Sequence, residues 1–415
     1  MSSKFIIDFL PDFSSMRASV LATALFGALV LASCTTGRVE QRQPVKPEPM
    51  LPPLTTTQTT PSTPTPALRP STFLAVPGWD RDDLREAWRP FLSSCIVLAK
   101  KPDWKEPCGV AQNVNGQDAS AVRDFFEAFL VPYQVINADG TEQGLVTGYY
   151  EPLLHGARAR GGVYQTPIYR TPDDLLTIDL SSIYPDLKNM RLRGKLVGNK
   201  VVPYGSRADL TSGDALAGKE LLWVDNAIEA FFLEIQGSGR VQLADTHEQV
   251  RVAYADQNGY PYKSIGRYLV DKGEMTLDQA SAQSIKAWAA VHPDRLAELL
   301  DANPSYVFFK EEKVADPSIG PKGSIGVALT PQRSIAVDNQ FIPPGVPVFL
   351  VTTQPSSDAD LQRLMMAQDT GGAIRGAVRA DFFWGFGSEA QDKAGKMKQR
   401  GTMWVLLPKS VPPAS

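Results

Sequence analysis

Apolar and polar positions repeat with two different periods along the chain, and the change of period divides it. In DRDDLREAWRPFLSSCIVLAK and DASAVRDFFEAFL, apolar residues recur every three or four positions, which predicts amphipathic helices. From Gln143 onward, GLVTGYYEPLLHG and VYQTPIYRTP are short β-like runs broken by Gly and Pro. The pattern therefore predicts a helical part followed by β-structure.

A second helical region interrupts the β-structure before the chain returns to strands. NAIEAFFLEIQGSGRVQL predicts a helix followed by a strand, KSIGRYLVDKG a helix ending at Gly273, and TLDQASAQSIKAWAAVHP a helix starting at Thr276 with Gln279 in capping-box spacing. After Pro304 the apolar runs are short: SYVFFK, SIGVALT, RSIAVD, GVPVFLVTT, LMMAQD, DFFWGFG and GTMWVLLP. Many short strands at this spacing indicate a closed barrel or a sandwich.

The first 72 residues do not carry a core-forming pattern. Arg17 precedes ASVLATALFGALVLASC, which has the charged start and apolar middle of a secretory signal, and Met16 is an alternative start. Leu31-Ala32-Ser33-Cys34 resembles a bacterial lipobox, which implies lipidation of Cys34; the alternative is an ordinary cleaved signal. With Thr35 following, the resemblance implies anchoring at the outer membrane, facing the periplasm. Residues 35–72 are rich in Pro and Thr and predict a disordered tether.

Length and composition exclude several classes of protein. A chain of 415 residues predicts two or more compact units, and no repeat period is apparent. A net charge of -3 offers no basic field to nucleic acid. The three histidines, His155, His247 and His292, show no ligand spacing, so neither a metal nor another cofactor is expected. A monomer is the default expectation.

Two cysteines, Cys95 and Cys108, remain after the signal segment. An exported compartment permits a disulfide between them. The spacing leaves open a bridge or two separate buried thiols.

Three aspartates near the C-terminus are candidates for chemistry. Asp369 opens an Asp-Thr-Gly sequence, but aspartic proteases need two such loops and this chain has one. Asp381 lies among aromatic residues, where desolvation would raise its pKa as a general acid requires; the alternative is a strand-end residue. Asp338 precedes a Pro-Pro-Gly turn and fits a turn cap. Trp384 fits either a sugar subsite or the filling of a barrel.

Together these segments resemble the membrane-bound lytic murein transglycosylase A family with its C-terminal three-aspartate domain. The resemblance covers about 130–410 and rests on VDNQFIPPG from Val337, DTGGAIRG from Asp369, ADFFWGFG from Ala380, TGYYEP from Thr147, TPIYR from Thr166, IQGSG from Ile235, YKSIG from Tyr262 and NPSYVFF from Asn303. One departure is that the segment from Gly376 to Asp381 is a residue longer than the family pattern.

The resemblance implies an α+β fold, mainly β with accessory helices. It implies a double-psi β-barrel at 311–410, an inserted β-barrel-like domain at 146–240, and a glycan groove between them. Helical segments at 78–145 and 241–310 belong to the catalytic part in this interpretation. Residues 1–34 are the signal and 35–72 the tether.

The resemblance also implies the reaction and the site. Family members cleave the β-1,4 bond between N-acetylmuramic acid and N-acetylglucosamine in peptidoglycan, forming a 1,6-anhydromuramic acid end. Asp381 would be the acid/base, and Asp369 and Asp338 would support it. The implied substrate-binding residues are Thr147, Gly148, Tyr149, Gln236, Gly237, Ser238, Gly371, Gly372 and Trp384. Peptidoglycan glycan strands are the expected partner, with cell-wall synthesis or division proteins as further candidates.

Two alternatives remain open at this point. A hydrolytic muramidase would need a second carboxylate facing Asp381, for which Glu151 and Glu234 are the candidates. A non-catalytic peptidoglycan-binding lipoprotein would use the same tether and anchor without cutting the glycan.

Overall fold

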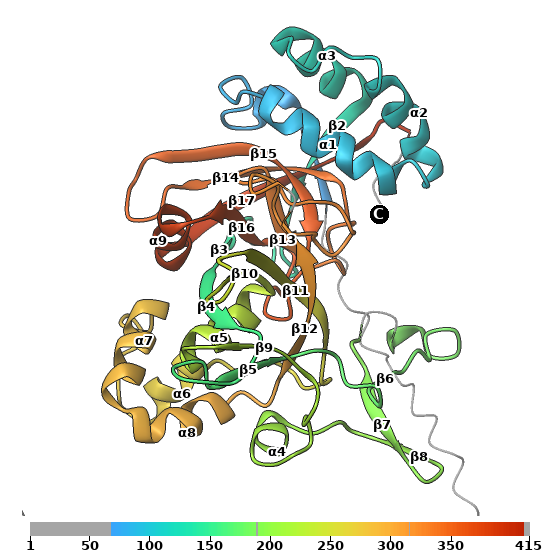
Figure 1. Ribbon diagram of the computed structural model, residues 1–415. Coiled ribbons are helices and arrows are strands. Elements are labelled where there is room, and N and C mark those ends of the chain that lie inside the picture. Colours follow the sequence, from blue (N-terminus) through green and yellow to red (C-terminus); the bar gives the residue numbers. More distant parts are fainter. Residues whose placement is uncertain (1–67, 188–189, 315, 411–415) are drawn as a thin grey trace, which may run out of the picture. The chain divides into compact units, whose positions relative to one another are not determined.

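Six hydrogen-bonded strands form a closed ring (Figure 1). The ring closes because the first and the last of these strands also pair with each other. The computed structural model describes residues 68–187, 190–314 and 316–410. The sheet order is β1-β2-β17-β14-β15-β13-β16-β3, and an additional β17–β3 pairing closes the ring. Its strands are β3 (Gly144–Glu151), β13 (Ser334–Val337), β14 (Pro347–Thr353), β15 (Asp360–Asp369), β16 (Arg379–Phe386) and β17 (Lys398–Pro408).

Most neighbouring strands of the ring are antiparallel, but β13–β15 and β16–β3 are parallel. Every residue of β13 is buried, as expected for a strand that has a partner on each side and both faces covered. Strand β2 (Leu130–Val135) extends the sheet beyond β17, and β1 (Leu68–Pro70) pairs with β2. Helix α9 (Ser388–Lys396) lies between β16 and β17 along the chain.

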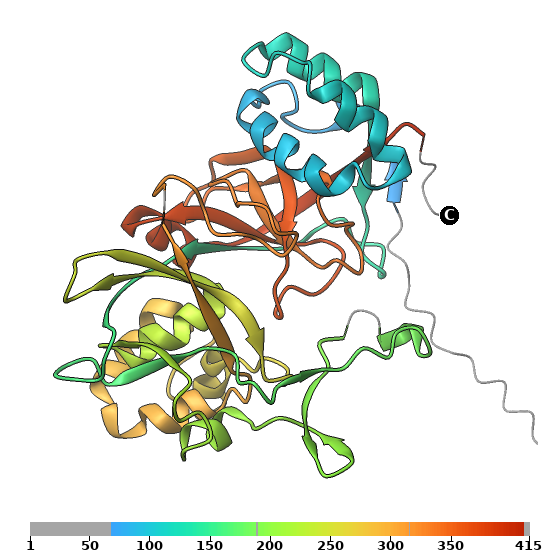
Figure 2. The same ribbon diagram turned by 45° about the vertical axis from the view of Figure 1, so that its right-hand side comes forward.

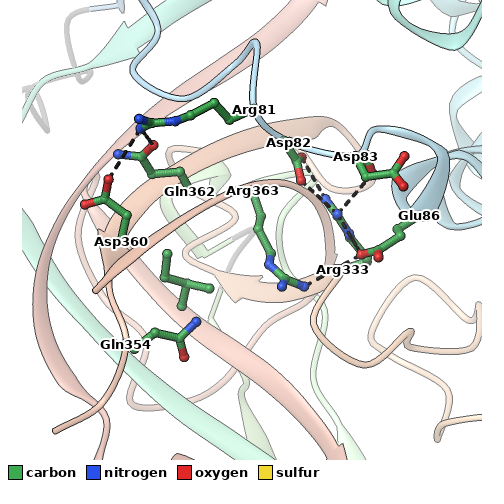
Figure 3. A pocket seen from close by; sticks show the side chains of 10 residues that line it. Arg81, Asp82, Asp83, Glu86, Arg333, Gln354, Asp360, Gln362 and Arg363 are labelled. Atoms are coloured by element: carbon green, nitrogen blue, oxygen red, sulfur yellow. Dashed lines mark hydrogen bonds and ion pairs between the residues drawn. The ribbon is translucent and has the colours of Figure 1, made fainter. Parts of the chain in front are cut away.

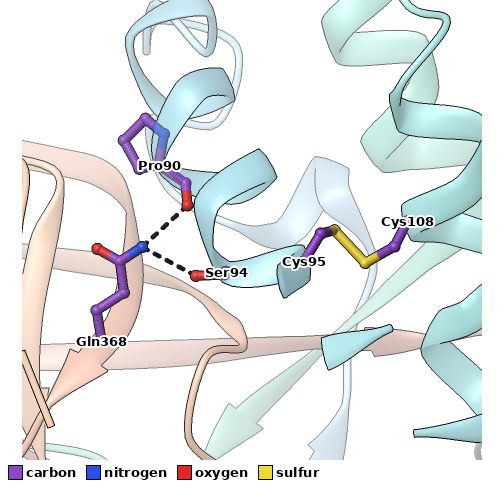
Figure 4. Close-up of a disulfide and its surroundings, with 5 residues drawn as sticks. All are labelled: Pro90, Ser94, Cys95, Cys108 and Gln368. Atoms are coloured by element: carbon purple, nitrogen blue, oxygen red, sulfur yellow. Dashed lines mark hydrogen bonds between the residues drawn. A yellow bond between two sulfur atoms is a disulfide. The ribbon is translucent and has the colours of Figure 1, made fainter. Parts of the chain in front are cut away.

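Three helices share one hydrophobic core with the ring. They are α1 (Arg85–Leu98), α2 (Pro102–Ala111) and α3 (Ala119–Phe129), preceded by the short η1 (Phe73–Ala75). Trp88 and Phe91 of α1 pack on Phe126 of α3 within this core. A disulfide joins Cys95 and Cys108 and so ties α1 to α2, with a Cα–Cα distance of 5.5 Å (Figure 4).

A second, six-stranded sheet has its own hydrophobic core. Its order is β12-β11-β10-β4-β9-β5. The strands are β4 (Leu153–Ala157), β5 (Thr166–Tyr169), β9 (Glu220–Val224), β10 (Ser238–Leu243), β11 (Gln249–Gln257) and β12 (Val307–Lys313). Leu222, Val241 and Val252 are fully buried in this core.

Helices and a small sheet accompany the six-stranded sheet. The helices are α4 (Arg207–Thr211), α5 (Ala227–Gln236), α6 (Ile265–Asp271), α7 (Ala282–Val291) and α8 (Leu296–Asp301), with η2 (Pro185–Leu187) and η3 (Pro293–Arg295). Strands β6 (Leu176–Thr177), β7 (Arg193–Val197) and β8 (Lys200–Val202) form a separate three-stranded sheet, green in Figure 2. Over the described ranges, no helix combines the length and the apolar character that crossing a membrane requires.

The structure is α+β, as predicted, but it differs from the predicted element boundaries in two places. Strand β3 belongs to the ring, although the inserted domain was predicted to begin at 146. Strands β11 and β12 belong to the second sheet, whereas 241–310 was predicted to return to the catalytic part and 311–410 to form the barrel. The signal, Cys34 and residues 35–67 of the predicted tether lie outside the described residues. The last residues of the predicted tether are ordered, because β1 pairs with β2.

Two local elements also differ from the prediction, because backbone groups in these segments bond to side chains. The helix predicted from Thr276 begins at Ala282, where Ser281 caps it by accepting from the backbone of Ser284; Gln279 instead closes a turn onto Thr276. SIGVALT is not a strand, since its first residue, Ser324, donates its backbone N–H to the Asp369 carboxylate.

Candidate active site

Two of the predicted aspartates pair with the same residue of β13, one from each neighbouring strand. We call such a set of directly paired residues on adjacent strands a rung of the ring. Ala336 pairs with Asp381 on β16 and with Asp369 on β15, and Asp381 in turn pairs with Thr147 on β3. Neighbouring strands lie about 4.8 Å apart, so the two aspartate backbones are separated by about 10 Å. Residues on one rung project to the same face. The fold therefore brings Asp369, Asp381 and Thr147 together.

A β-bulge at Gln368 puts Asp369 on this rung. The β13–β15 register shifts between Ile335, which pairs with Ala367, and Ala336, which pairs with Asp369, so Gln368 is the extra residue. Its fully buried amide accepts from Ser334 Oγ at 2.6 Å and donates to Pro90 O at 2.9 Å and Ser94 Oγ at 3.0 Å (Figure 4). These bonds hold the bulge against α1.

Asp381 has one oxygen that is held and one that is free. Thr147 Oγ1 donates to Asp381 Oδ1 at 2.6 Å, and none of the described residues donates to Oδ2. Since every buried side-chain polar atom in the described ranges has a partner, Oδ2 is accessible. Burial raises the pKa of Asp381, while the Thr147 hydrogen bond and the Arg379 charge lower it in part. A carboxyl group with a raised pKa and one open oxygen suits a general acid.

Asp369, by contrast, uses both of its oxygens. Oδ1 accepts from the backbone N–H groups of Ser324 at 3.0 Å and Thr370 at 2.9 Å, and Oδ2 accepts from Tyr149 Oη at 3.0 Å. Burial raises the pKa of Asp369 to about 6, and the charge of Asp381 adds to this effect. Burial and the nearby Asp369 carboxylate raise the pKa of Tyr149, so its phenol stays neutral. Asp369 is thus a fixed neighbour of Asp381.

Asp338 lies just beyond β13 and holds a turn in place. It is fully buried, and its Oδ2 accepts from Gly376 N at 2.9 Å while Oδ1 accepts from Gln340 N at 3.2 Å. Arg375 lies 3.7 Å from Oδ1. Asp338 therefore fastens the segment that connects Asp369 to Asp381 onto the end of β13, as the turn-cap interpretation expects.

Besides Thr147, the predicted substrate-binding residues lie in three places. Gly371 and Gly372 follow Asp369 in the turn, and Gln236, Gly237 and Ser238 lie at the junction of α5 and β10. Gln236 Oε1 accepts from Tyr150 N at 2.9 Å, which ties this junction to β3 three residues beyond Thr147.

Gly148 packs against the buried Trp384 ring, whereas Tyr149 projects to the opposite face of β3, the face of Thr147. The Trp384 ring is buried in the core, its Nε1 donates to Met397 Sδ at 3.3 Å, and a Cβ on Gly148 would meet this ring at 2.7 Å. Tyr149 packs on Phe383 and reaches the site through its hydroxyl. Trp384 is not positioned to stack on a sugar and Gly148 serves close packing, so we correct both assignments.

The two alternative carboxylates are tied up in buried ion pairs. Glu151 accepts from Arg240 at 2.9 Å and also from Arg251, and all three side chains are buried. Glu234 accepts from Arg207 at 2.7 Å and from a backbone N–H. Neither carboxylate is therefore free to serve as a second catalytic group opposite Asp381.

A hollow of about 300 Å³ lies elsewhere and holds none of the predicted site residues (Figure 3). It is lined by charged side chains, most of which pair with each other. Arg333 is bound by Asp82 at 2.8 Å and by Glu86 at 2.8 Å, and Arg81 donates to Gln362 at 2.6 Å. These pairs fasten the start of the helical part to β15.

The sequence patterns did not reveal two residues of the site, Arg379 and Gln368. Arg379 Nη2 donates to Thr147 Oγ1 at 2.8 Å, and Gln368 supports the bulge beside Asp369. A polar Gln directly after the buried run Leu364–Ala367 is the one signal that could have indicated the bulge.

Comparisons with known proteins agree with this arrangement. The sequence matches the family described as MltA specific insert domain over residues 145–310 and the 3D domain over residues 333–407. It is 34% identical over 282 residues to membrane-bound lytic murein transglycosylase A of Escherichia coli strain K12, covering 66% of this chain and 68% of that protein.

Solved structures are similar over most of the chain. MltA from Neisseria gonorrhoeae is 37% identical with a TM-score of 0.71, covering 83% of this chain and 93% of that one. The lytic transglycosylase LtgG of Burkholderia pseudomallei is 48% identical with a TM-score of 0.55, covering 83% and 96%. The chain described here therefore belongs to the membrane-bound lytic murein transglycosylase A family.

Proposed function

We propose that Asp381 is the single acid/base with which this protein cleaves the β-1,4 bond between N-acetylmuramic acid and N-acetylglucosamine. Family membership makes the protein an enzyme, a lytic transglycosylase that acts on peptidoglycan. The observation that carries the residue assignment is the free Oδ2 of Asp381 beside an Asp369 whose two oxygens are both occupied.

One carboxyl group is sufficient if the nucleophile belongs to the substrate. Protonated Asp381 donates its proton to the glycosidic oxygen as the C1–O bond breaks, and the sugar C6 hydroxyl attacks C1. The hydroxyl proton then passes to Asp381, which restores the acid. The products are a 1,6-anhydromuramic acid end and a free 4-hydroxyl, with no water consumed. The tethered C6 hydroxyl removes much of the entropic barrier that an external nucleophile would face.

Asp369 supports this cycle without exchanging protons with the glycan. Its backbone and Tyr149 bonds hold it in place, and a carboxylate near Asp381 disfavours a second negative charge. Burial raises the pKa of Asp381 and so favours the protonated form that the leaving oxygen needs.

We extend the proposal to the architecture around the site. The six-strand ring corresponds to a double-psi β-barrel, the six-stranded sheet with its helices to an inserted domain, and the glycan strand runs between them. The Gln236–Tyr150 bond supports this path, because Tyr150 lies about 10 Å along β3 from Thr147. Gln236, Gly237 and Ser238 would then offer donors to N-acetyl groups, and the turn at Gly371 and Gly372 would border the glycan near Asp369.

The site of action follows from the chain before residue 68. The relatives are named membrane-bound, and the sequence offers Cys34 as a lipid attachment point. We propose that the enzyme is held at the outer membrane by lipid on Cys34 and faces the periplasmic peptidoglycan. Cell-wall synthesis or division proteins are further candidate partners.

The test is mass spectrometry of the muropeptides that the protein releases from purified sacculi, beside the Asp381→Asn variant. Products lighter by one water than hydrolysis products, and absent with the variant, are expected. Products with reducing ends would instead indicate a muramidase with a second carboxylate. A folded protein that sediments with sacculi and releases nothing would indicate a binding protein.

A further inference from the structure

Arg379 contacts the candidate acid through a third residue. It precedes Asp381 by two positions on β16, so both side chains project to the same face of the sheet. Its Nη2 donates to Thr147 Oγ1 at 2.8 Å, and its Nη1 donates to the carbonyl oxygens of Leu145 and Ala380.

The Arg379–Thr147 bond has a fixed direction, and it biases the direction of the Thr147–Asp381 bond. A guanidinium group stays charged and has donors only, so Thr147 Oγ1 must accept from Arg379. The hydroxyl oxygen keeps a second lone pair, but the adjacent guanidinium charge disfavours a second donor there and directs the hydroxyl hydrogen to Asp381 Oδ1, 2.6 Å away. Oδ1 is thereby an acceptor and cannot also hold a proton in that bond. This arrangement favours Oδ2 as the oxygen that carries the proton of protonated Asp381.

We propose that Arg379 is a positioning residue that, by orienting the Thr147 hydroxyl, keeps the transferable proton of Asp381 on its accessible oxygen. The proposal rests on Asp381 being the acid/base. Without Arg379, the Thr147 hydroxyl can rotate and accept from Asp381 Oδ1–H. In that state the acid presents an unprotonated oxygen to the leaving group, and this fraction of molecules cannot start the reaction.

Other charged or titratable groups also face Asp381, and the variants must leave them unchanged. They are Asp369 on β15 and Tyr149 on β3, while Lys398 on β17 pairs with Thr147 from the other side of β3. Because the Arg379 charge lowers the pKa of Asp381, removing it raises that pKa. The basic limb of the pH–rate profile should then move to higher pH, whereas loss of proton placement lowers the plateau below that limb. The two effects are separable.

The experiment is a double-mutant cycle on the full chain in detergent, acting on purified glycan strands. Arg379→Met and Thr147→Val should each lower kcat by about tenfold, the size of losing a hydrogen bond to a charged group, with KM changed less than twofold. The double variant should lose no more kcat than Thr147→Val alone, since Arg379 acts through that hydroxyl. Arg379→Lys, which keeps a charged donor, should recover part of the rate.

The matched control is Arg400→Met. Arg400 is an exposed cation that pairs with Leu145 from the opposite side of β3, and it should change neither kcat nor the pH profile. Additive losses in the cycle, or an Arg379→Met effect confined to KM or thermal stability, would overturn the proposal. The product analysis shows which proposal has failed. If the wild type makes anhydro products and Asp381→Asn makes none, additive losses in the cycle contradict only the role of Arg379. If the wild type makes reducing-end products, the proposed function itself is wrong.

Discussion

At the scale of single residues, the proton on Asp369 affects the stability of the fold, whereas the proton on Asp381 is the one proposed to take part in the reaction. Burial raises the folded-state pKa of Asp369 from 3.8 to about 6, so the folded protein binds a proton that the unfolded chain has already released. The free energy of unfolding should therefore fall as pH rises from about 4 to about 6, by at most about 3 kcal/mol from this residue.

Asp369→Asn should flatten this pH dependence, because asparagine does not titrate. The measurement is urea unfolding at pH 4 and pH 7, with Asp358→Asn as a control at an exposed aspartate. Equal slopes against pH in the wild type and Asp369→Asn would show that the buried carboxyl carries no such penalty.

The sequence motifs and the family resemblance named the candidate residues of the site but not their hydrogen bonds. Asp381, Asp369 and Thr147 stand in recognisable motifs, and the fold brings them to one rung. Strand alternation already separates Asp381 from Trp384, which are three positions apart and so project to opposite faces. That rule would have removed Trp384 from the site. No sequence pattern indicates that Arg379 reaches Thr147, since that contact exists only once β16 lies beside β3.

At the scale of elements, the bulge at Gln368 links helix α1 to the catalytic rung. Gln368→Leu keeps the approximate volume but leaves Ser94 and Ser334 without their buried partner. We expect it to lower the free energy of unfolding by about 2–4 kcal/mol and to lower kcat as well, because Asp369 loses its register. Ser94→Ala removes one bond only and should cost about 1 kcal/mol. A Gln368→Leu protein with unchanged stability and kcat would contradict a role for the bulge.

The disulfide supports the same helix one residue further on. Cys95 and Cys108 are 13 positions apart, and a loop of this length gains about 3 kcal/mol from restricting the unfolded chain. The Cys95→Ser/Cys108→Ser pair should be less stable by that order in urea unfolding. Adding reductant should lower the stability of the wild type and leave the variant unchanged; an equal effect on both would exclude the bridge as the cause.

At the scale of the whole chain, local patterns could not assign the strands to their sheets. The ring pairs β3 with strands far along the chain, Thr147 with Asp381 at 234 positions, and the six-stranded sheet takes β12 from beyond the helical region. Hydrophobic periodicity specifies that a segment is a strand but not which partner it finds. The predicted start of the inserted domain at 146, close to the start of the family match at 145, falls inside β3, and the pairing of β3 with β16 and β17 places this strand in the ring.

Glu151 connects the parts of the fold that these long-range pairings bring together. Glu151 is the last residue of β3 and accepts from Arg240 on β10 and Arg251 on β11. The same two arginines donate to the carbonyl oxygens of Pro317 and Ile319, on the segment that leads back toward β13. Glu151→Gln would leave two buried guanidinium groups without their carboxylate, which costs about 3–5 kcal/mol.

The same variant separates a structural carboxylate from a catalytic one. Well below its lowered melting temperature, Glu151→Gln should still release anhydro-muropeptides, because Asp381 is intact. Asp381→Asn should show the opposite behaviour: an unchanged or raised melting temperature, since a desolvated carboxyl is removed, with no product. Calorimetry and product analysis on both variants check this. A stable Glu151→Gln protein that has lost all activity would mean that Glu151, although buried by two arginines, takes part in bond cleavage.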